Sequence, residues 1–507
     1  MIRSKIFLIA ALFAFSLLSC SKRRPEPVGP APIILARAGD RDITLDDFIR
    51  RAEYTIRPSY VKGNTYIHKK MVLNSIIAEK LFALEAGPDN DLAHHPGFIN
   101  FIRGRTEQAM RKHLFQAEGL QKVELDSAEI ANAYRYAGRK VRVAYFSVPT
   151  AEMAQRIEQR LQSGEADFET IYANMTGGEG ELPEREVEWS EEGNERIHQQ
   201  LFRDSLRVGQ TFPPIEAEAG LFTAIKVLGW TDQPAVSENQ KHQRWADVSE
   251  RLRREKAYGL YVQFASRVMR GKEVQFVEQT LMQLADKMLP LYFLTDEIRQ
   301  QAFNEKFWAN KEAELPFEGV PEEIMDAPLL RIEGDVWRVR DLQDEIARHP
   351  LVFRKQRMSR AEFPRQFQLA IVDLIRDKYL TRVAYDRGYE KIESVIRTKQ
   401  MWSDHLVSLF HRDQVLNQHG ITREQFATGY LEIIEQVMND YVDSLQVKYS
   451  DRIEINTDVF EKIRLTRIDM FVTEKNVPYP VRVPSFPILT TDKWLDYGRK
   501  MENEQTE

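Results

Sequence analysis

Few residues of this 507-residue chain have the types and spacing that catalysis or metal binding requires. His94 and His95 are adjacent and precede Pro96 on a polar turn, so we expect them in a solvated loop and not as a pair of metal ligands. Five glutamates between residues 179 and 188 form an acidic stretch, which is typical of solvated surface. The sequence contains no glycine-rich phosphate loop, no Gly-x-Ser-x-Gly and no zincin motif. The sequence therefore predicts neither a metal site nor a small-molecule cofactor.

The single cysteine, Cys20, follows an apolar run that extends from Ile6 to Leu18. Arg3 and Lys5 precede this run, which is too short to cross a bilayer as a helix. A basic start followed by a short apolar run is typical of a secretory signal peptide. We therefore expect residues 1–19 to be a signal and the mature protein to be extracytoplasmic.

The segment around the cysteine, Leu17-Leu18-Ser19-Cys20, resembles the lipobox of bacterial lipoproteins. The resemblance implies that Cys20 receives a diacylglycerol and becomes the new N-terminus, so that acyl chains hold the protein on a membrane. Residues 20–32 contain four prolines and predict an extended tether. We expect a periplasm-facing protein anchored by lipid to a bacterial membrane, with the outer membrane favoured.

Composition places the rest of the chain among globular proteins. Hydrophobic residues make up 43% of the sequence and charged residues 29%, with a net charge of −6. This mildly acidic balance gives no electrostatic footprint for nucleic acid. With one cysteine there is no intrachain disulfide, so packed cores must supply the stability of about three or four domains.

Two parts of the chain repeat the same order of predicted elements, and such a repeat indicates the architecture of the whole chain. Residues 34–48 and residues 329–342 each predict a short strand, a turn containing Gly-Asp, a second short strand and the start of a helix. Further along, residues 76–81 correspond to residues 374–379, and both have apolar residues at helical spacing.

The correspondence continues beyond these helices. His113-Leu114 corresponds to His405-Leu406. Each copy then ends in an extended alternating segment, which we expect to close that copy: Val274-Gln275-Phe276 in the first and Ile453-Glu454-Ile455 in the second. The shared order predicts a duplicated helical module.

The first copy contains about a hundred residues, between Ala137 and Ala235, that the second lacks. This insert begins with an alternating strand at 141–148, continues through two helices and a glycine-rich loop, and ends in a strand at 222–228. The succession predicts a small antiparallel sheet covered by helices.

Several runs give the insert a specific resemblance. They are Ser163-Gly164-Glu165, Asp167-Phe168, Leu206-Arg207-Val208-Gly209-Gln210 and Ile225-Lys226-Val227-Leu228. With them the insert resembles a parvulin-type (PpiC-like) peptidyl-prolyl isomerase domain, and the flanking repeat resembles the helical chaperone domain of SurA/PrsA-type periplasmic folding factors. The resemblance implies an α+β fold, mostly helical: a duplicated SurA-N-like helical chaperone module whose first copy carries an inserted, small, parvulin-like antiparallel α/β domain.

The expected domain boundaries follow from these elements. They are a lipoprotein signal peptide at 1–19, a lipidated tether at 20–32, the start of the first helical chaperone module at 33–138, a parvulin-like domain at 139–231, a helical return completing that module at 232–284, connecting helices at 285–327, a second module at 328–463 and an extended C-terminal arm at 464–507.

Parvulins typically place one histidine in the first strand and one in the last, close together under the substrate proline. By the matching runs these positions are Ala144 and Thr223, neither of which replaces imidazole in a hydrogen-bond network. We therefore assign no catalytic residue. His198 precedes Leu201-Phe202, and we expect it on a helix face in a structural role. The candidate peptide-binding cleft consists of aromatic residues: Tyr145, Phe146, Phe212 and Phe222.

These resemblances imply a membrane-tethered periplasmic chaperone or foldase that binds unfolded or proline-containing polypeptides, with weak or lost isomerase activity. One alternative is an active prolyl isomerase with a histidine-free pocket, because isomerisation has a torsional barrier and needs no covalent chemistry. A second alternative is a scaffold lipoprotein that binds one folded partner. Two linked modules would give a client several weak contacts and so raise the overall avidity.

Replacement of the lipidated residue tests the anchor. We predict that Cys20→Ala releases the protein from the membrane fraction while the folded body keeps its circular dichroism spectrum and melting temperature, because the acyl chains are the strong anchor in the sequence. A Cys20→Ala protein that stays with the membrane after a high-salt wash would contradict this prediction.

Overall fold

The computed structural model describes residues 31–63, 65–178, 181–191, 194–218, 220–293, 320–355, 358–465, 479, 482–494 and 498–501. Cys20 and most of the tether lie outside these residues, as do parts of the connecting segment and of the C-terminal arm. Within them the chain is mostly helical and its strands form three small sheets, so the α+β class is confirmed. None of the described helices is long and apolar enough to span a membrane.

The elements keep their order along the chain. The strands are β1 (Ile34–Ala38), β2 (Arg41–Thr44), β3 (Arg139–Val148), β4 (Glu184–Glu188), β5 (Thr211–Glu218), β6 (Leu221–Asp232), β7 (Gln275–Phe276), β8 (Pro328–Ile332), β9 (Asp335–Arg338), β10 (Ile453–Ile455) and β11 (Arg499–Lys500). The α-helices are α2 (Leu45–Glu53), α3 (Tyr66–Ala86), α4 (Pro96–Glu118), α5 (Ser127–Tyr134), α6 (Ala151–Ser163), α7 (Phe168–Thr176), α8 (Glu195–Leu201), α9 (Glu238–Met269), α10 (Glu278–Tyr292), α12 (Glu322–Met325), α13 (Val339–Arg348), α14 (Phe363–Asp386), α15 (Glu393–Gln418), α16 (Arg423–Ile433), α17 (Asn439–Lys448) and α18 (Thr457–Lys462).

Both predicted hairpins form, and local chemistry explains where each one turns. Gly39 reverses the chain between β1 and β2 with a φ of 65°, a conformation that glycine adopts without steric cost. Thr44 then caps α2, because its hydroxyl accepts a hydrogen bond from the Asp47 N–H at 3.0 Å. The second hairpin turns through Glu333-Gly334, and the Asp341 carboxylate accepts from the Arg338 N–H at the start of α13.

The closing strands pair with the opposite hairpin from the one expected. β10 pairs with β1, with Ala36 opposite Ile455, whereas β7 pairs with β8, with Gln275 opposite Arg331. The order of elements along the chain predicts that each strand closes its own copy. An alternating pattern identifies a strand and its buried face but does not identify its partner, which the packing of distant helices decides.

The helices follow the same exchange. α3 packs against α15 and α17, whereas α14 packs against α4 and α10. The core under the first hairpin accordingly combines both ends of the chain, among them Leu35, Phe48, Leu73, Phe82, Leu416, Phe426, Val442 and Phe460. The core under the second hairpin combines Leu281, Leu284 and Met288 with Leu329, Phe363 and Phe367. The last part of the segment 232–284 therefore packs on the second hairpin and not on the first.

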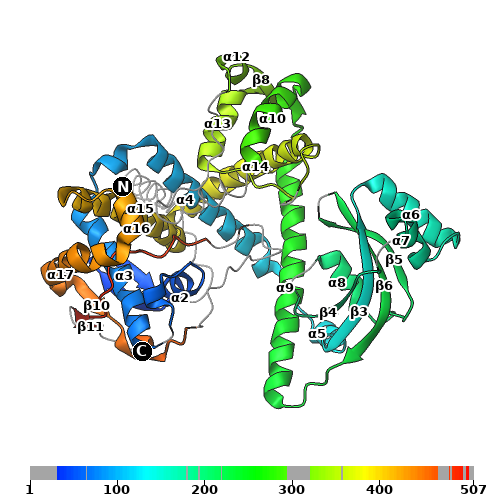
Figure 1. Cartoon of the computed structure of the whole chain (residues 1–507), viewed down its shortest axis with the longest axis horizontal. Coiled ribbons are helices and arrows are strands. Elements are labelled where there is room, and N and C mark those ends of the chain that lie inside the picture. Colours follow the sequence, from blue (N-terminus) through cyan, green and yellow to red (C-terminus); the bar gives the residue numbers. More distant parts are fainter. Residues whose placement is uncertain are drawn as a thin grey trace, which may run out of the picture.

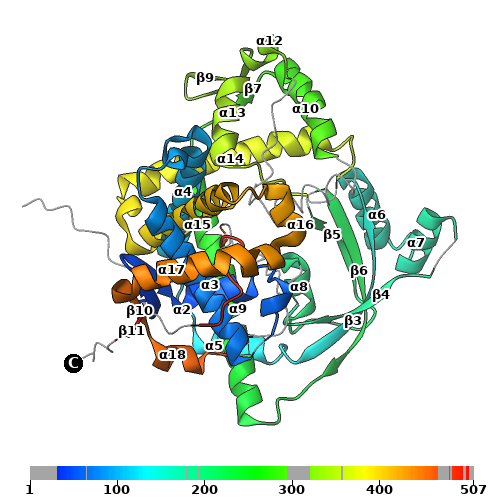
Figure 2. The same ribbon diagram turned by 60° about the vertical axis from the view of Figure 1, so that its left-hand side comes forward.

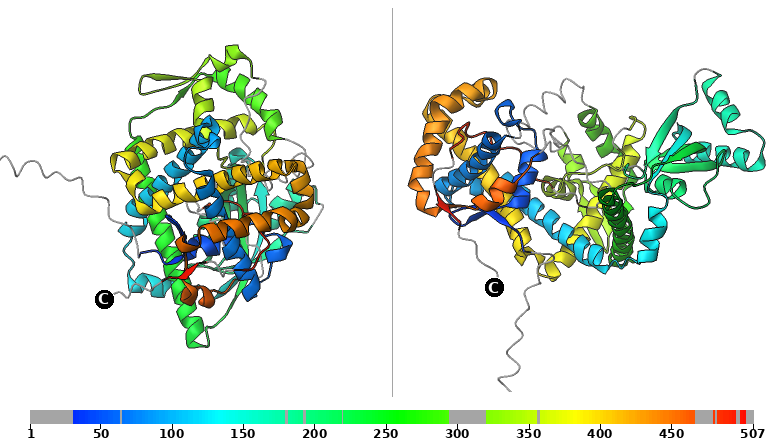
Figure 3. Two further views of the ribbon diagram at one scale, coloured as in Figure 1. Left: turned by 90° about the vertical axis from the view of Figure 1, so that its left-hand side faces the viewer. Right: turned by 90° about the horizontal axis from the view of Figure 1, so that it is seen from below.

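The long helix α9 stands between the helical body and a sheet that carries its own helices (Figure 1). This sheet is antiparallel, in the order β4-β3-β6-β5, and we call residues 139–232 the sheet unit. Its ends lie side by side: Arg139 is opposite Asp232, and the Gly138 carbonyl accepts a hydrogen bond from the Gln233 N–H at 2.8 Å. Figures 2 and 3 show α14, α15 and α17 as successive helices across the helical body.

A buried ionic network joins α2, α3 and α15. Arg51 binds both carboxylate oxygens of Glu79, at 3.1 and 2.7 Å, and the His405 Nδ1 lies 2.6 Å from the same carboxylate. Lys80 reaches Asp404 at 3.1 Å. Burial alone would raise the pKa of Glu79, but the charges of Arg51 and Lys80 and the contact with His405 outweigh burial and hold that pKa well below its ordinary value.

We predict that Glu79→Gln lowers the free energy of unfolding by about 3–5 kcal/mol, because Arg51 and Lys80 then keep buried charges without their counterion. The matched control is Glu85→Gln on the same helix, where Glu85 pairs with the exposed Lys448 and its replacement should cost less than about 1 kcal/mol. Urea denaturation followed by circular dichroism measures both changes. Equal losses for the two variants would contradict the central role of the network.

Candidate functional site

The two faces of the β4-β3-β6-β5 sheet have different neighbours, because successive residues of a strand point to opposite sides. On β3, Ala144, Phe146 and Val148 point toward α6 and α7 and form an apolar cluster with Phe168 and Ile171. The rings of Phe146 and Phe168 lie 4.8 Å apart. This face is therefore filled by the core of the sheet unit.

The opposite face carries a groove of about 660 Å³, which we call the sheet groove. It is lined by Val143, Tyr145, Ser147, Arg185, Val187, Asn194, Glu195, Arg196, Ile197, Leu201, Ala217, Thr223 and Ile225. Aliphatic side chains from β3, β4, β6 and α8 contribute to the lining, and the exposed residues Arg185 and Arg196 add positive charge. Six of the lining residues are aliphatic and seven carry a polar group, so the groove offers both apolar and polar contacts.

Two of the polar groups in the sheet groove are hydroxyls that contact each other. The Ser147 and Thr223 hydroxyl oxygens lie 2.9 Å apart across β3 and β6. The Arg185 guanidinium lies over the Tyr145 ring, 5.6 Å from its centre. The lining contains no histidine, so the groove offers hydrogen bonds and apolar contact without an imidazole base.

The four predicted cleft residues do not lie together. Tyr145 lines the sheet groove, whereas Phe146 and Phe222 belong to the cluster beneath α6 and α7. Phe212 is buried in the core on the groove side, and the Arg203 guanidinium lies 5.3 Å from its ring centre. The aromatic cleft expected from the sequence is therefore replaced by a groove of aliphatic and polar side chains with one aromatic residue, Tyr145.

Ala144 does not occupy the position expected of the first parvulin histidine. Ala144 lies beneath α6 and α7 while Thr223 lines the groove, so the two cannot meet under one substrate. The register pairs Ser147 with Thr223 and Tyr145 with Ile225. Tyr145 and Ser147 are thus the β3 residues that share the groove face with Thr223. The alternation of residues along β3 predicts this arrangement, because the adjacent residues Ala144 and Tyr145 must point to opposite faces of the sheet.

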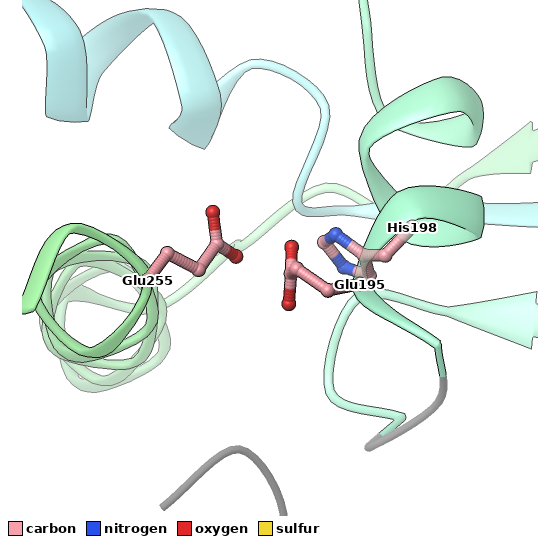
Figure 4. Close-up of side chains that lie close together, drawn as sticks. All are labelled: Glu195, His198 and Glu255. Carbon is pink, nitrogen blue, oxygen red and sulfur yellow. The ribbon is translucent and has the colours of Figure 1, made fainter. Parts of the chain in front are cut away.

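Beside the groove, a cluster of charged side chains joins α8 to α9; we call it the α8–α9 joint (Figure 4). Arg251 lies between two carboxylates, with its Nε 3.1 Å from Glu255 and its Nη2 3.2 Å from Glu195. The His198 ring packs edge-to-face against Trp189, with ring centres 4.6 Å apart, and its Nε2 lies 3.1 Å from the Trp189 carbonyl. Sequence reasoning gave His198 a structural role and missed both glutamates, because nothing in the sequence shows that α8 docks on α9.

The environment of the joint shifts two pKa values. Burial, together with a hydrogen bond and charge from Glu195, raises the pKa of Glu255 to about 8. Burial and then the charge of Arg251 lower the pKa of His198 to about 3. At neutral pH the joint therefore contains a neutral imidazole and a mainly protonated Glu255 carboxyl.

The other chemical candidates have structural roles. His94 is exposed and pairs with Asp89 at 2.7 Å, and His95 caps α4, so neither forms a metal pair. The Ser485 hydroxyl lies 3.4 Å from the His405 Nε2, whose Nδ1 contacts Glu79, in the order of a hydrolytic triad. None of the His405 side chain is exposed, however, and a general base must reach the reacting group.

No protein-family model matches the chain, and no curated protein matches it.

The raised pKa of Glu255 makes stability depend on pH. Between about pH 4.5 and 8 the folded protein holds a proton that the unfolded chain releases, so this group's contribution to stability falls as pH rises through that window. Glu255→Gln keeps the joint neutral at every pH. In a buffer with EDTA we predict that the variant gains on the order of 2 kcal/mol over the parent at pH 8.5 and loses that advantage near pH 5. Parallel stability curves from pH 5 to 9 would show that Glu255 does not hold this proton.

Proposed function

We propose that this protein is a chaperone that holds unfolded polypeptide segments, with the sheet unit as its peptide-binding arm. The observation that carries the proposal is the sheet groove. Its volume of about 660 Å³ lies within the range of about 300–1,000 Å³ that is usual for ligand sites. Val143, Ile197 and Ile225 are buried and form the floor of the groove. The more exposed side chains of Tyr145, Ser147 and Arg185 would contact a bound peptide.

The helical body supports the same proposal. We propose that its two halves are copies of one module that have exchanged partners, which accounts for the reciprocal pairing of β10 with β1 and of β7 with β8. On α9, Tyr258 and Val262 lie one turn apart and are each 45% exposed. Such surfaces would add weak apolar contacts to those of the groove and raise the avidity for one long client.

The family proposal follows from the sequence resemblances and is consistent with this fold. According to this proposal, the chain is a SurA/PrsA-type folding factor with a parvulin-like domain. A lipid at Cys20 would hold it on the periplasmic side of a bacterial membrane, with the outer membrane favoured. Its partners would be unfolded secreted or outer-membrane polypeptides. The groove has apolar and polar contacts for a client but no imidazole, which favours holding over chemistry.

Prolyl isomerisation is a second candidate, favoured by one observation. Tyr145, Ser147 and Thr223 bring three hydroxyl groups to the groove face of β3 and β6. Hydroxyls donate and accept hydrogen bonds, and the reaction needs only a pocket that favours the twisted imide. Activity on a proline tetrapeptide that falls on Tyr145→Phe and Thr223→Val would establish this candidate.

A groove-filling substitution tests the chaperone proposal. Ser147 is exposed in the groove, whereas Arg142 is exposed on the same strand and points to the other face. We predict that Ser147→Trp weakens binding of a labelled unfolded peptide at least about tenfold and impairs suppression of aggregation of varied client proteins. Arg142→Trp should stay within about twofold of the parent.

Fluorescence anisotropy and light scattering measure these two effects. Equal effects of the two tryptophans, or no suppression of aggregation by the parent protein, would contradict the proposal. Capture of one folded partner, with no affinity for unfolded chains, would instead indicate the scaffold alternative.

A further inference from the structure

We propose that Glu195, His198 and Glu255 form a binding site for a divalent transition-metal ion, of which Zn²⁺ is the best match, at the α8–α9 joint. The proposal does not depend on the chaperone function. It concerns residues that the groove and its ligand do not require, apart from the carboxylate of Glu195, which also lines the groove.

The three side chains already converge on one point. One ligand atom from each lies within 4.8 Å of the others. Glu195 and His198 are three residues apart on α8 and so lie on one side of that helix, and Glu255 reaches them from α9 (Figure 4). Tetrahedral coordination at about 2.0–2.2 Å would require the atoms to close to about 3.3 Å, a movement that side-chain rotation supplies.

His198 has the arrangement of a metal-ligating histidine. Its residue is 5% exposed, and its Nε2 bonds the Trp189 carbonyl at 3.1 Å. Because the carbonyl can only accept, Nε2 carries the hydrogen and Nδ1 carries a lone pair. No hydrogen bond to Nδ1 occurs among the residues that the structure describes. Ligating histidines commonly donate their other ring N–H to a backbone carbonyl in this way.

The carboxylates of Glu195 and Glu255 together carry one more negative charge than Arg251 neutralises. Arg251 engages Glu195 Oε2 and Glu255 Oε1, whereas Glu195 Oε1 is buried and no described donor reaches it. Two carboxylates and one guanidinium sum to one negative charge in a partly buried place, so a proton or a cation must lie between the carboxyl groups. Two carboxylate oxygens and one imidazole nitrogen form the donor set of a three-ligand zinc site, with a fourth position for water.

Isothermal titration with ZnCl₂ tests the proposal. The full chain is used with Cys20→Ala, which removes the one thiol in the sequence. We expect one Zn²⁺ per chain with a dissociation constant in the micromolar range or below, and a rise in melting temperature with Zn²⁺. Glu255→Gln and His198→Ala should each weaken binding at least about tenfold and abolish the rise. The matched controls are Glu250→Gln and His242→Ala, which replace exposed residues of α9 and should leave binding within about twofold.

Glu255→Gln decides the test if His198→Ala fails to fold, because Glu255 lies at the edge of the joint with 21% of its side chain exposed. Three results would overturn the proposal. They are no stoichiometric binding by the parent, binding that survives Glu255→Gln, and binding that the control His242→Ala weakens as much as Glu255→Gln does.

Discussion

Glu79 carries its charge with none of its side chain exposed, and the charge remains buried only because Arg51, Lys80 and His405 surround it. A buried ion without its partners would cost several kcal/mol, so α3 cannot take its place in the core until α2 and α15 are there. Arg51 also donates to the Ser485 carbonyl at 2.7 Å, which adds the C-terminal arm to the same cluster. The N-terminal hairpin therefore depends on residues more than three hundred positions away, and its fold cannot be complete before the C-terminal third of the chain is present.

The corresponding place in the other half of the body is built differently. Asp377, which the proposed repeat aligns with Glu79, lies 3.7 Å from Arg111 of α4, and Arg111 also donates to Thr381 at 2.7 Å. Asp377 keeps about a fifth of its side chain exposed and also contacts Arg376 and the Tyr479 hydroxyl, so its charge is partly solvated as well as paired. In both halves the acidic residue of one segment meets a helix of the other. The reciprocal strand pairing thus extends into the side chains, and the two halves differ mainly in how deeply the contact is buried.

Local chemistry made much of this fold predictable, and tertiary docking made the rest unpredictable. The turn at Gly39, the cap at Thr44 and the adjacent ends of the sheet unit follow from residues close together in the sequence or from the limits of an insert. The partners of β7 and β10 do not, because a short strand satisfies its hydrogen bonds equally well on either hairpin. In the site, the alternation of residues along β3 places Tyr145 and Phe146 on opposite faces of the sheet, so these two residues cannot line one cleft. The approach of Glu255 to Glu195 had no local signal, since it arises only when α8 docks on α9.

That docking gives α9 a mechanical role. Toward its start, Val248 packs in the core of the sheet unit and Arg251 holds the joint; toward its end, Tyr261 and Phe264 pack with α4 and α14 in the helical body. A helix of 32 residues spans about 48 Å and bends little, so it fixes the distance between the two parts while leaving their angle to the contacts at each end. The end in the helical body packs mainly through apolar side chains, whereas the joint also contains charged groups. The contacts among Glu195, Arg251 and Glu255, together with the packing of Val248 in the core of the sheet unit, therefore fix how the groove sits on α9.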